Sequence, residues 1–212
     1  MYESIEHMWK AKIVDEQGRG GNGNGKHPIA AKMVETRSKS EHGSRIGICS
    51  KETWYRVAVR YWDRQPATVD GVLGGYEGIH ETEIGTSRAI LTKFKSHMPR
   101  LKLALDCGAG IGRVTKTLLK GAFEHVDLLE PSDTQINKAR KYCQQEARKF
   151  YHQGLETFQY EEPYDCIWIQ WVLCYLTDGD IYDFLVKTKR DGLTRDESGR
   201  TGLIFVKENT SD

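Results

Sequence analysis

The sequence predicts an α/β fold with a parallel, doubly wound sheet, and three observations support this prediction. A short apolar run at residues 101–105 leads into a glycine-rich turn and then a helical pattern. A second apolar segment, residues 125–129, ends at Glu130. Strand and helix patterns then alternate through residue 209, which is typical of βαβ units. Ligands of such folds bind at the carboxyl ends of the strands.

Residues 1–50 differ in composition from the remainder of the chain. They carry several glycines among charged and small polar side chains, and they show little apolar periodicity. Such a segment buries too little apolar surface to offset the entropy of ordering. We therefore expect a disordered arm over residues 1–50 and one folded domain over residues 51–212.

The first helix is expected near residues 53–61, where apolar side chains repeat every three or four residues and Ser50 or Thr53 can cap the N-terminus. Residues 68–76 follow Pro66 and contain three glycines, which favours unusual backbone angles or a close backbone approach. The four apolar side chains of this segment leave two alternatives, an ordinary surface loop or a loop covered by a ligand or partner. A second helix is predicted over residues 86–94.

The turn after the first predicted strand carries Gly108, Gly110 and Gly112. The missing side chains allow a sharp turn and a close ligand, and the following helix offers unpaired N–H groups. Glu130 ends the next predicted strand, near the place where nucleotide-binding folds put an acid on the ribose hydroxyls. The two motifs together predict a nucleotide site, whereas the glycines alone are equally typical of a tight strand-to-helix turn.

The rest of the chain continues the alternation of strand and helix. Helices are predicted over residues 134–149 and 181–189, and strands over residues 149–153, 163–172 and 201–209. The candidate ligand-binding residues follow the carboxyl ends of these strands.

Composition limits the expected partners. The chain has 212 residues and a formal net charge of +1, so it lacks the strongly basic balance typical of nucleic-acid binding. Its five cysteines include no C-x-x-C pair, which argues against zinc and disulfides, and we predict no metal site. No uncharged apolar run reaches membrane-spanning length, and the first residues lack a signal-peptide pattern. We therefore expect an intracellular protein without nucleic-acid or membrane partners.

Five motifs together resemble the protein α-N-terminal methyltransferases, which methylate the free amine of proteins that begin X-Pro-Lys or X-Pro-Arg. They are YW at 61–62, TVDGVLGGY at 68–76, LDCGAGIGR at 105–113, IWIQWV at 167–172 and KEN at 207–209. The resemblance runs from about residue 54 to residue 209. It implies a Rossmann-like methyltransferase fold, S-adenosyl-L-methionine as cofactor, and N-terminal tails of proteins as partners. It also implies residence in the nucleus and cytoplasm.

The resemblance assigns roles around the cofactor. Arg113 would pair with the methionine carboxylate through its planar fork. Glu130, where the family more often has Asp, would accept hydrogen bonds from both ribose hydroxyls. The alternative for Glu130 is a solvated carboxylate at a strand end. The residues assigned to the cofactor are Trp62, Gly108, Gly110, Arg113, Glu130, Ser132, Leu155, Glu156 and Gln170, with Leu155 and Glu156 beside the adenine and Gln170 at the methionine portion.

The substrate and catalytic roles are implied in the same way. The substrate residues are Leu73 and Ile79 in the peptide channel, Trp171 against the substrate proline, and Asn209 at the first residue. For Trp62 and Trp171 the alternative is core packing, which is common for large aromatic side chains. Catalysis is assigned to Asn209 and Tyr175.

The chemistry expected of this site is modest. A sulfonium methyl group is already electrophilic, so the protein mainly has to align a neutral amine with it. An α-amino group has a pKa near ~8, so a modest base is sufficient. Asn209 can orient an amine without holding its proton. At Tyr175 the family usually has a histidine, whereas a tyrosine with a pKa of about 10 stays protonated and serves as a hydrogen-bond partner.

The end of the sequence leads to a further expectation. The chain stops three residues after Asn209, before the segment in which the family carries two aspartates and its last strands. We expect a fold that lacks those strands, an unpaired apolar edge at residues 203–206, and cofactor binding with weak or absent turnover. The second hypothesis is a catalytically weak or inactive relative that binds and regulates an active methyltransferase. A third, a small-molecule methyltransferase, is disfavoured by the loop at residues 68–76.

Overall fold

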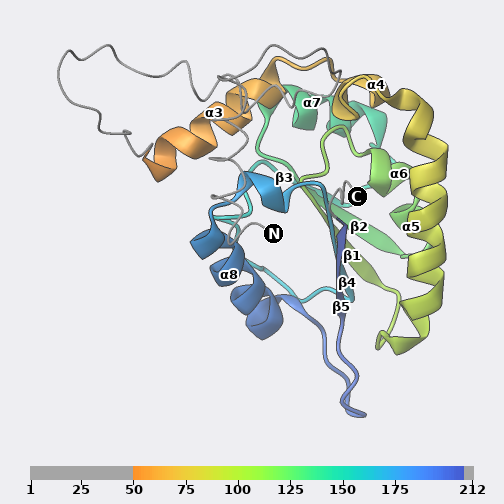
Figure 1. Cartoon of the computed structure of the whole chain (residues 1–212). Helices are drawn as coiled ribbons and strands as arrows, with labels where there is room; N and C mark the ends of the chain where they lie inside the picture. The colour runs from red at the N-terminus through yellow and green to blue at the C-terminus, as the bar shows by residue number, and fades with distance from the viewer. Residues whose placement is uncertain (1–49, 208–212) are drawn as a thin grey trace, which may run out of the picture.

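A computed structural model of the chain describes residues 50–207 (Figure 1). The arm predicted over residues 1–50 lies outside this range except for Ser50, and Asn209 lies outside it as well. Ser50 is the N-cap of the first described helix, because its hydroxyl accepts a hydrogen bond from the amide of Thr53. Ser50, rather than Thr53, is therefore the N-cap, and the helix begins at Lys51.

The centre of the fold is a five-stranded sheet of order β3-β2-β1-β4-β5, in which every pair of neighbours is parallel. The chain builds the sheet outward from β1 in one direction and then, from β4, in the other. This reversal creates a switch point beside β1, where ligands of open α/β sheets bind. The predicted parallel α/β fold is confirmed. The strands are β1 (Leu103–Cys107), β2 (His125–Leu129), β3 (Lys149–Tyr151), β4 (Cys166–Gln170) and β5 (Leu203–Lys207).

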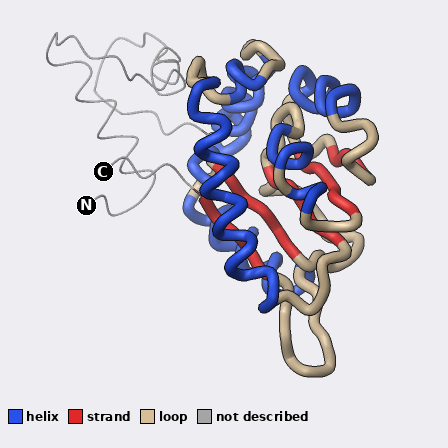
Figure 2. Tube along the Cα trace, turned by 90° about the vertical axis from the view of Figure 1, so that its right-hand side faces the viewer, coloured by secondary structure: helices blue, strands red, loops and turns tan. Residues whose placement is uncertain are grey.

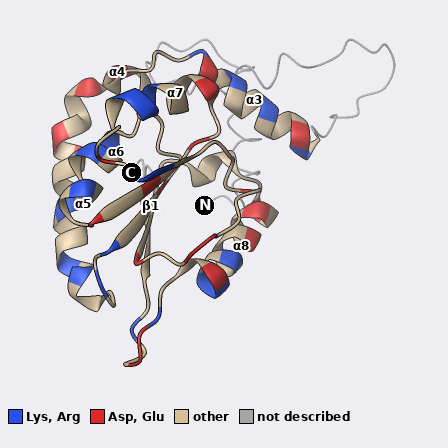
Figure 3. Cartoon of the chain, turned by 180° about the vertical axis from the view of Figure 1, so that it is seen from behind, with Lys and Arg blue, Asp and Glu red and all other residues tan. Residues whose placement is uncertain are grey.

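Helices cover both faces of this sheet (Figures 1 and 2). Helices α5 and α6 contribute Ile84 and Val114 to the core on one face, and α8 contributes Phe184 to the core on the other. Charges of both signs are interspersed along α3, α5 and α8 (Figure 3). The helices are α3 (Lys51–Asp63), α4 (Val69–Val72), α5 (His80–Phe94), α6 (Arg113–Thr117), α7 (Asp133–Tyr142) and α8 (Asp178–Lys187).

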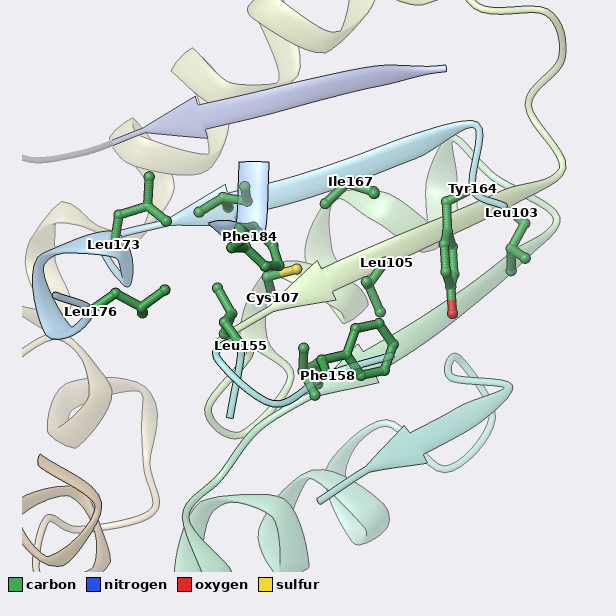
Figure 4. Close-up of a cluster of buried hydrophobic side chains, with 12 residues drawn as sticks. Leu103, Leu105, Cys107, Leu155, Phe158, Tyr164, Ile167, Leu173, Leu176 and Phe184 are labelled. Carbon is green, nitrogen blue, oxygen red and sulfur yellow. The ribbon is translucent and has the colours of Figure 1, made fainter. Parts of the chain in front are cut away.

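The central strand β1 is buried along its whole length. Successive side chains of a strand point to opposite faces. Leu105 and Cys107 accordingly pack with Phe184 in the cluster shown in Figure 4, whereas Ala104 packs with Ile84 in the cluster beneath α5. Burial on both faces explains why this strand is apolar in the sequence except for Asp106.

Two helix boundaries differ from the predictions by more than one turn. Helix α5 begins at His80 rather than residue 86, after a short 3₁₀ turn at Glu77–Ile79. Helix α7 ends at Tyr142 rather than near residue 149, because residues 143–147 form a turn that leads into β3. Arg148 at this point forms a two-bond ion pair with the buried carboxylate of Asp127. Tertiary pairing therefore overrides a helix-favouring local sequence.

The strand β5 forms one edge of the sheet in the described range. The predicted strand over residues 201–209 is observed over Leu203–Lys207, and Val206 exposes 49% of its surface. Among the described helices, none is long and apolar enough to cross a membrane.

Candidate functional site

The glycine turn joins β1 to α6 and is held close to its neighbours. All three glycines have positive φ, 64° at Gly108, 56° at Gly110 and 82° at Gly112. A Cβ at Gly108 would lie 2.5 Å from Val172, and one at Gly112 would lie 2.3 Å from the sulfur of Cys143. The backbone conformation and the space both require glycine at these two positions.

The loop at residues 68–76 packs against this turn. A Cβ placed on Gly110 would meet the side chain of Val72 at 3.2 Å. Thr68 caps the short helix α4 by accepting a hydrogen bond from the amide of Gly71, and Leu73 at its end is only 5% exposed. The apolar side chains of this loop are therefore covered in part by the glycine turn.

Glu130 lies at the end of β2 and faces the turn from the neighbouring strand. Its carboxylate accepts hydrogen bonds from the amide of Gly110 at 2.9 Å and from the amide of Ser132 at 2.8 Å. Burial raises the pKa of Glu130 to about 7, although these two N–H groups act in the opposite direction. Each carboxylate oxygen keeps a further lone pair, so a pair of ligand hydroxyls can still be accepted.

Asp106 of β1 is hydrogen-bonded to the helix that follows the glycine turn. Its carboxylate accepts hydrogen bonds from the amide of Thr115 at 2.9 Å and from the hydroxyl of Thr115 at 2.7 Å. Burial raises the pKa of Asp106 to about 6. These bonds fix α6 to β1 and so fix the direction in which the first residues of α6 point.

Arg113 is the first residue of α6 and is 5% exposed. One guanidinium nitrogen, Nη1, lies 2.5 Å from Oε2 of Glu83 and 3.1 Å from Nδ1 of His80. Both partners belong to α5, and they were not predictable from the sequence because no motif links them to the glycine turn. The planar fork leaves further N–H donors on Arg113 for an anionic ligand group.

Gln170 ends β4 on the other side of β1. Its Oε1 accepts a hydrogen bond of 2.8 Å from the indole of Trp168. Its Nε2 is buried and has no hydrogen-bond partner within residues 50–207. An unmet buried donor costs free energy, so its presence at a strand end points to a ligand that accepts its hydrogen bond.

The aromatic residues Trp171 and Tyr175 follow Gln170 in the sequence, and Tyr175 contacts Trp62. Trp171 has φ of 56°, the one described residue other than glycine with positive φ. A bulky residue in this region stores strain, which is typical of functional sites. The rings of Trp62 and Tyr175 meet edge to face with centroids 6.0 Å apart, and the carbonyl of Tyr175 accepts a hydrogen bond from Trp54. The structure thus brings Trp62 of α3 to the segment that follows β4.

The remaining predicted site residues occupy different environments. Leu155 is 2% exposed and belongs to the core, whereas Ile79 is 42% exposed. Glu156 is half-buried, its carboxylate folds back over Gly154, and burial raises its pKa. Within the described range no group of three or more His, Cys, Asp or Glu side chains is placed to hold a metal ion.

The sheet order, the glycine turn and the acid at the end of β2 define an enzyme of the Rossmann-like methyltransferase class, which uses the nucleoside cofactor S-adenosylmethionine. A family model described as AdoMet dependent proline di-methyltransferase matches residues 50–212. The chain belongs to this family.

Relatives and solved structures agree with this assignment. The chain is 41% identical over 165 residues to N-terminal Xaa-Pro-Lys N-methyltransferase 1-B of Xenopus laevis, covering 74% of this chain and 71% of the relative. It is 42% identical over 171 residues to the Danio rerio N-terminal Xaa-Pro-Lys N-methyltransferase 1, covering 77% and 74%. A SAM-dependent methyltransferase of Leishmania major superposes with a TM-score of 0.68 at 32% identity, over 100% of this chain and 71% of that one.

The residues present fit the cofactor. The glycine turn brings no side chain of its own to the end of β1, Glu130 keeps free acceptor sites, and Gln170 offers an unmet donor across the switch point. We assign the cofactor site to this edge of the sheet. The individual contacts predicted for the cofactor and substrate residues, including those of Asn209, stay predictions.

Proposed function

We propose that this methyltransferase acts on the free α-amino group of proteins whose N-terminus reads Xaa-Pro-Lys or Xaa-Pro-Arg. The observation that carries the proposal is the identity of about 40% to methyltransferases named for Xaa-Pro-Lys, over about three quarters of the chain. The aromatic group at the end of β4 supports it, because a flat indole such as Trp171 suits a proline ring.

The bound cofactor supplies an electrophilic methyl group. The chain's own residues then have to hold the ligands and exclude water. Glu130 and Gln170 lie on opposite sides of β1, so they hold opposite ends of one elongated ligand. Trp62 closes against Tyr175 and covers the approach from solvent. We propose that Tyr175 orients the substrate amine by hydrogen bonding and that Asn209 assists it.

The substrate amine has to arrive without its proton. With a pKa of about 8, a minority of α-amino groups is neutral at neutral pH, so the site needs alignment more than a strong base. We therefore expect the rate to rise with pH as the neutral fraction of the peptide grows.

The direct test uses the chain, labelled cofactor and two matched peptides that differ only at position two. We expect slow methyl transfer to a Ser-Pro-Lys peptide, in line with the weak turnover expected of this chain, and at least about tenfold slower transfer to a Ser-Ala-Lys peptide. Acetylation of the N-terminus of the first peptide removes the nucleophile and should abolish transfer. Equal transfer to the proline and alanine peptides, or transfer to the acetylated peptide, would overturn the proposal.

We further propose protein N-terminal tails as the partners of this chain and residence in both nucleus and cytoplasm. The support for both is the resemblance of the motifs at residues 61–76 and 167–172 to the family. Imaging of the tagged full chain tests the second point, and exclusion of the tag from the nucleus would contradict it.

A further inference from the structure

Helix α3 connects the two segments that carry opposite walls of the cofactor site. One segment follows β2 and contains Glu130, and the other follows β4 and contains Tyr175. These strands lie on opposite sides of β1. In Figure 1, α3 reaches α7 with one end and lies on the same side of the sheet as α8.

The C-terminal end of α3 is fixed to the segment after β2. Oδ1 of Asp63 accepts hydrogen bonds from the hydroxyl of Ser132 at 2.7 Å and from the amide of Thr134 at 3.3 Å. Gln135 donates to the carbonyl of Trp62 at 3.0 Å. The amide of Ser132 also donates to Glu130, so Ser132 is hydrogen-bonded both to Asp63 and to the acid of the cofactor site.

The N-terminal half of α3 is fixed to the segment after β4 through Asp180. The hydroxyl of Tyr55 donates to one carboxylate oxygen of Asp180, and Lys51 pairs with the other oxygen at 2.5 Å. The amide of Thr177 in turn donates to the hydroxyl of Tyr55 at 3.2 Å. Trp54 on the same helix donates to the carbonyl of Tyr175 at 2.6 Å.

This arrangement differs from an ordinary helix cap. Thr177 is the N-cap of α8 and Asp180 is its third residue, the spacing of a capping box. In a capping box the acid accepts the hydrogen bond of the N-cap amide directly. Here the hydroxyl of Tyr55 stands between that amide and Asp180. The cap of α8 is therefore completed by a residue of α3.

We propose that α3 is a clasp that sets the separation of the two walls of the cofactor site, and that Asp63 and Asp180 are positioning residues at its two ends. Neither aspartate touches the other, and neither is one of the residues assigned to the cofactor. Trp62, the residue before Asp63, packs edge to face against Tyr175. The proposal rests on the cofactor site and not on the identity of the peptide substrate.

The test is a double-mutant cycle that measures the affinity for S-adenosylhomocysteine by calorimetry. Asp63→Ala and Asp180→Ala should each weaken binding about tenfold. A clasp released at one end no longer spans the site, so the double variant should also lose only about tenfold. A loss of about a hundredfold, which is the product of the single effects, would show independent roles and overturn the proposal.

Two controls separate positioning from general stability. Asp183→Ala changes an exposed acid one turn further along α8, and Arg60→Ala changes an exposed side chain of α3, so both should leave the affinity unchanged. If Asp63→Ala and Asp180→Ala lower the unfolding temperature without changing the affinity, the clasp is wrong.

A milder variant covers the case in which an alanine variant does not fold. Tyr55→Phe keeps the ring and removes only the hydroxyl that joins Thr177 to Asp180. It should weaken cofactor binding about threefold to tenfold, and unchanged binding would overturn the proposal. Peptide methylation is not measured, so a failure of the proposed substrate would not affect this outcome.

Discussion

The carboxylate of Glu130 and the backbone amide of Gly110 form a hydrogen bond of 2.9 Å between the ends of two neighbouring strands. This bond joins the acid after β2 to the glycine turn after β1, and burial of the Glu130 carboxylate limits the competition from water. The acid therefore both shapes the turn and faces the ligand.

Glu130→Gln should weaken the binding of S-adenosylhomocysteine about tenfold to a hundredfold. The amide group replaces one carboxylate oxygen with an NH2 donor, which then faces a backbone N–H group. It also removes the charge of the acceptor. Together these changes should reduce the binding free energy by about 1.5–3 kcal/mol. Calorimetry measures the change. Glu124→Gln, at an exposed position before β2, is the matched control and should bind as the unchanged protein does.

The affinity for S-adenosylhomocysteine should rise with pH through about pH 7. The pKa of Glu130 is raised from 4.5 to about 7, so the carboxyl group is largely protonated at pH 6 and ionised at pH 8. Ligand hydroxyls donate better to the ionised form, and the ionised fraction rises about tenfold over this range. A flat affinity between pH 6 and pH 8 would contradict this assignment, and Glu130→Gln should remove most of the dependence.

The same titration affects stability in the opposite direction. Between pH 4.5 and about 7 the folded protein holds a proton on Glu130 that the unfolded chain has released, so the contribution of this group to stability falls as pH rises. Urea unfolding without ligand at pH 5.5 and pH 7.5 measures it. On going from pH 5.5 to pH 7.5, the free energy of unfolding of the unchanged protein should therefore fall relative to that of Glu130→Gln.

Gly112→Ala should destabilise the protein by about 3 kcal/mol. The added Cβ would lie 2.3 Å from the sulfur of Cys143, and φ of 82° is strained for alanine. Gly121→Ala is the control, because its Cβ meets nothing within 4 Å. Adding Cys143→Ala to Gly112→Ala should recover part of the loss, since it removes the nearest atom. Full additivity of the two changes would show that the contact is not the cause.

The sequence was sufficient for the strands because β1, β2 and β4 are largely buried and therefore mostly apolar, although Asp106 and Asp127 lie within them. It was less informative where a charged residue is buried or a helix-favouring segment is not helical. The start of α5 was missed because Glu83, which is buried, and Gly85 interrupt the apolar pattern of its first turns. The end of α7 was missed because the pairing of Arg148 with Asp127 depends on strands that local sequence does not reveal.

The site was predictable where it is encoded in a continuous motif. Gly110, Glu130 and Ser132 come together as the glycine turn and the following strand predict. The partners Glu83 and Asp180 were not predictable, because each acts on a residue far away in the sequence and a single acidic residue carries no spacing signal.

Glu83→Gln should destabilise the protein by about 3 kcal/mol in the absence of cofactor. The ion pair with Arg113 is buried, with each side chain about 6% exposed, so removing one charge leaves the other without compensation. Thermal unfolding measures the effect. Glu81→Gln lies on the same helix with its side chain 92% exposed and should change stability by less than about 0.5 kcal/mol. Equal unfolding temperatures for the two variants would show that the buried pair contributes nothing.

Gln170→Glu should weaken S-adenosylhomocysteine binding about tenfold while leaving the binding of 5′-methylthioadenosine unchanged. The new carboxylate still offers an oxygen to Trp168, but it replaces the unmet Nε2 donor with an acceptor. Methylthioadenosine lacks the amino-acid portion, so it separates a contact at that portion from one at the nucleoside. Gln144→Glu at an exposed position controls for the added charge. Equal losses for both ligands would place Gln170 against the nucleoside and would contradict the role predicted for it, because the donor then faces the wrong end of the cofactor.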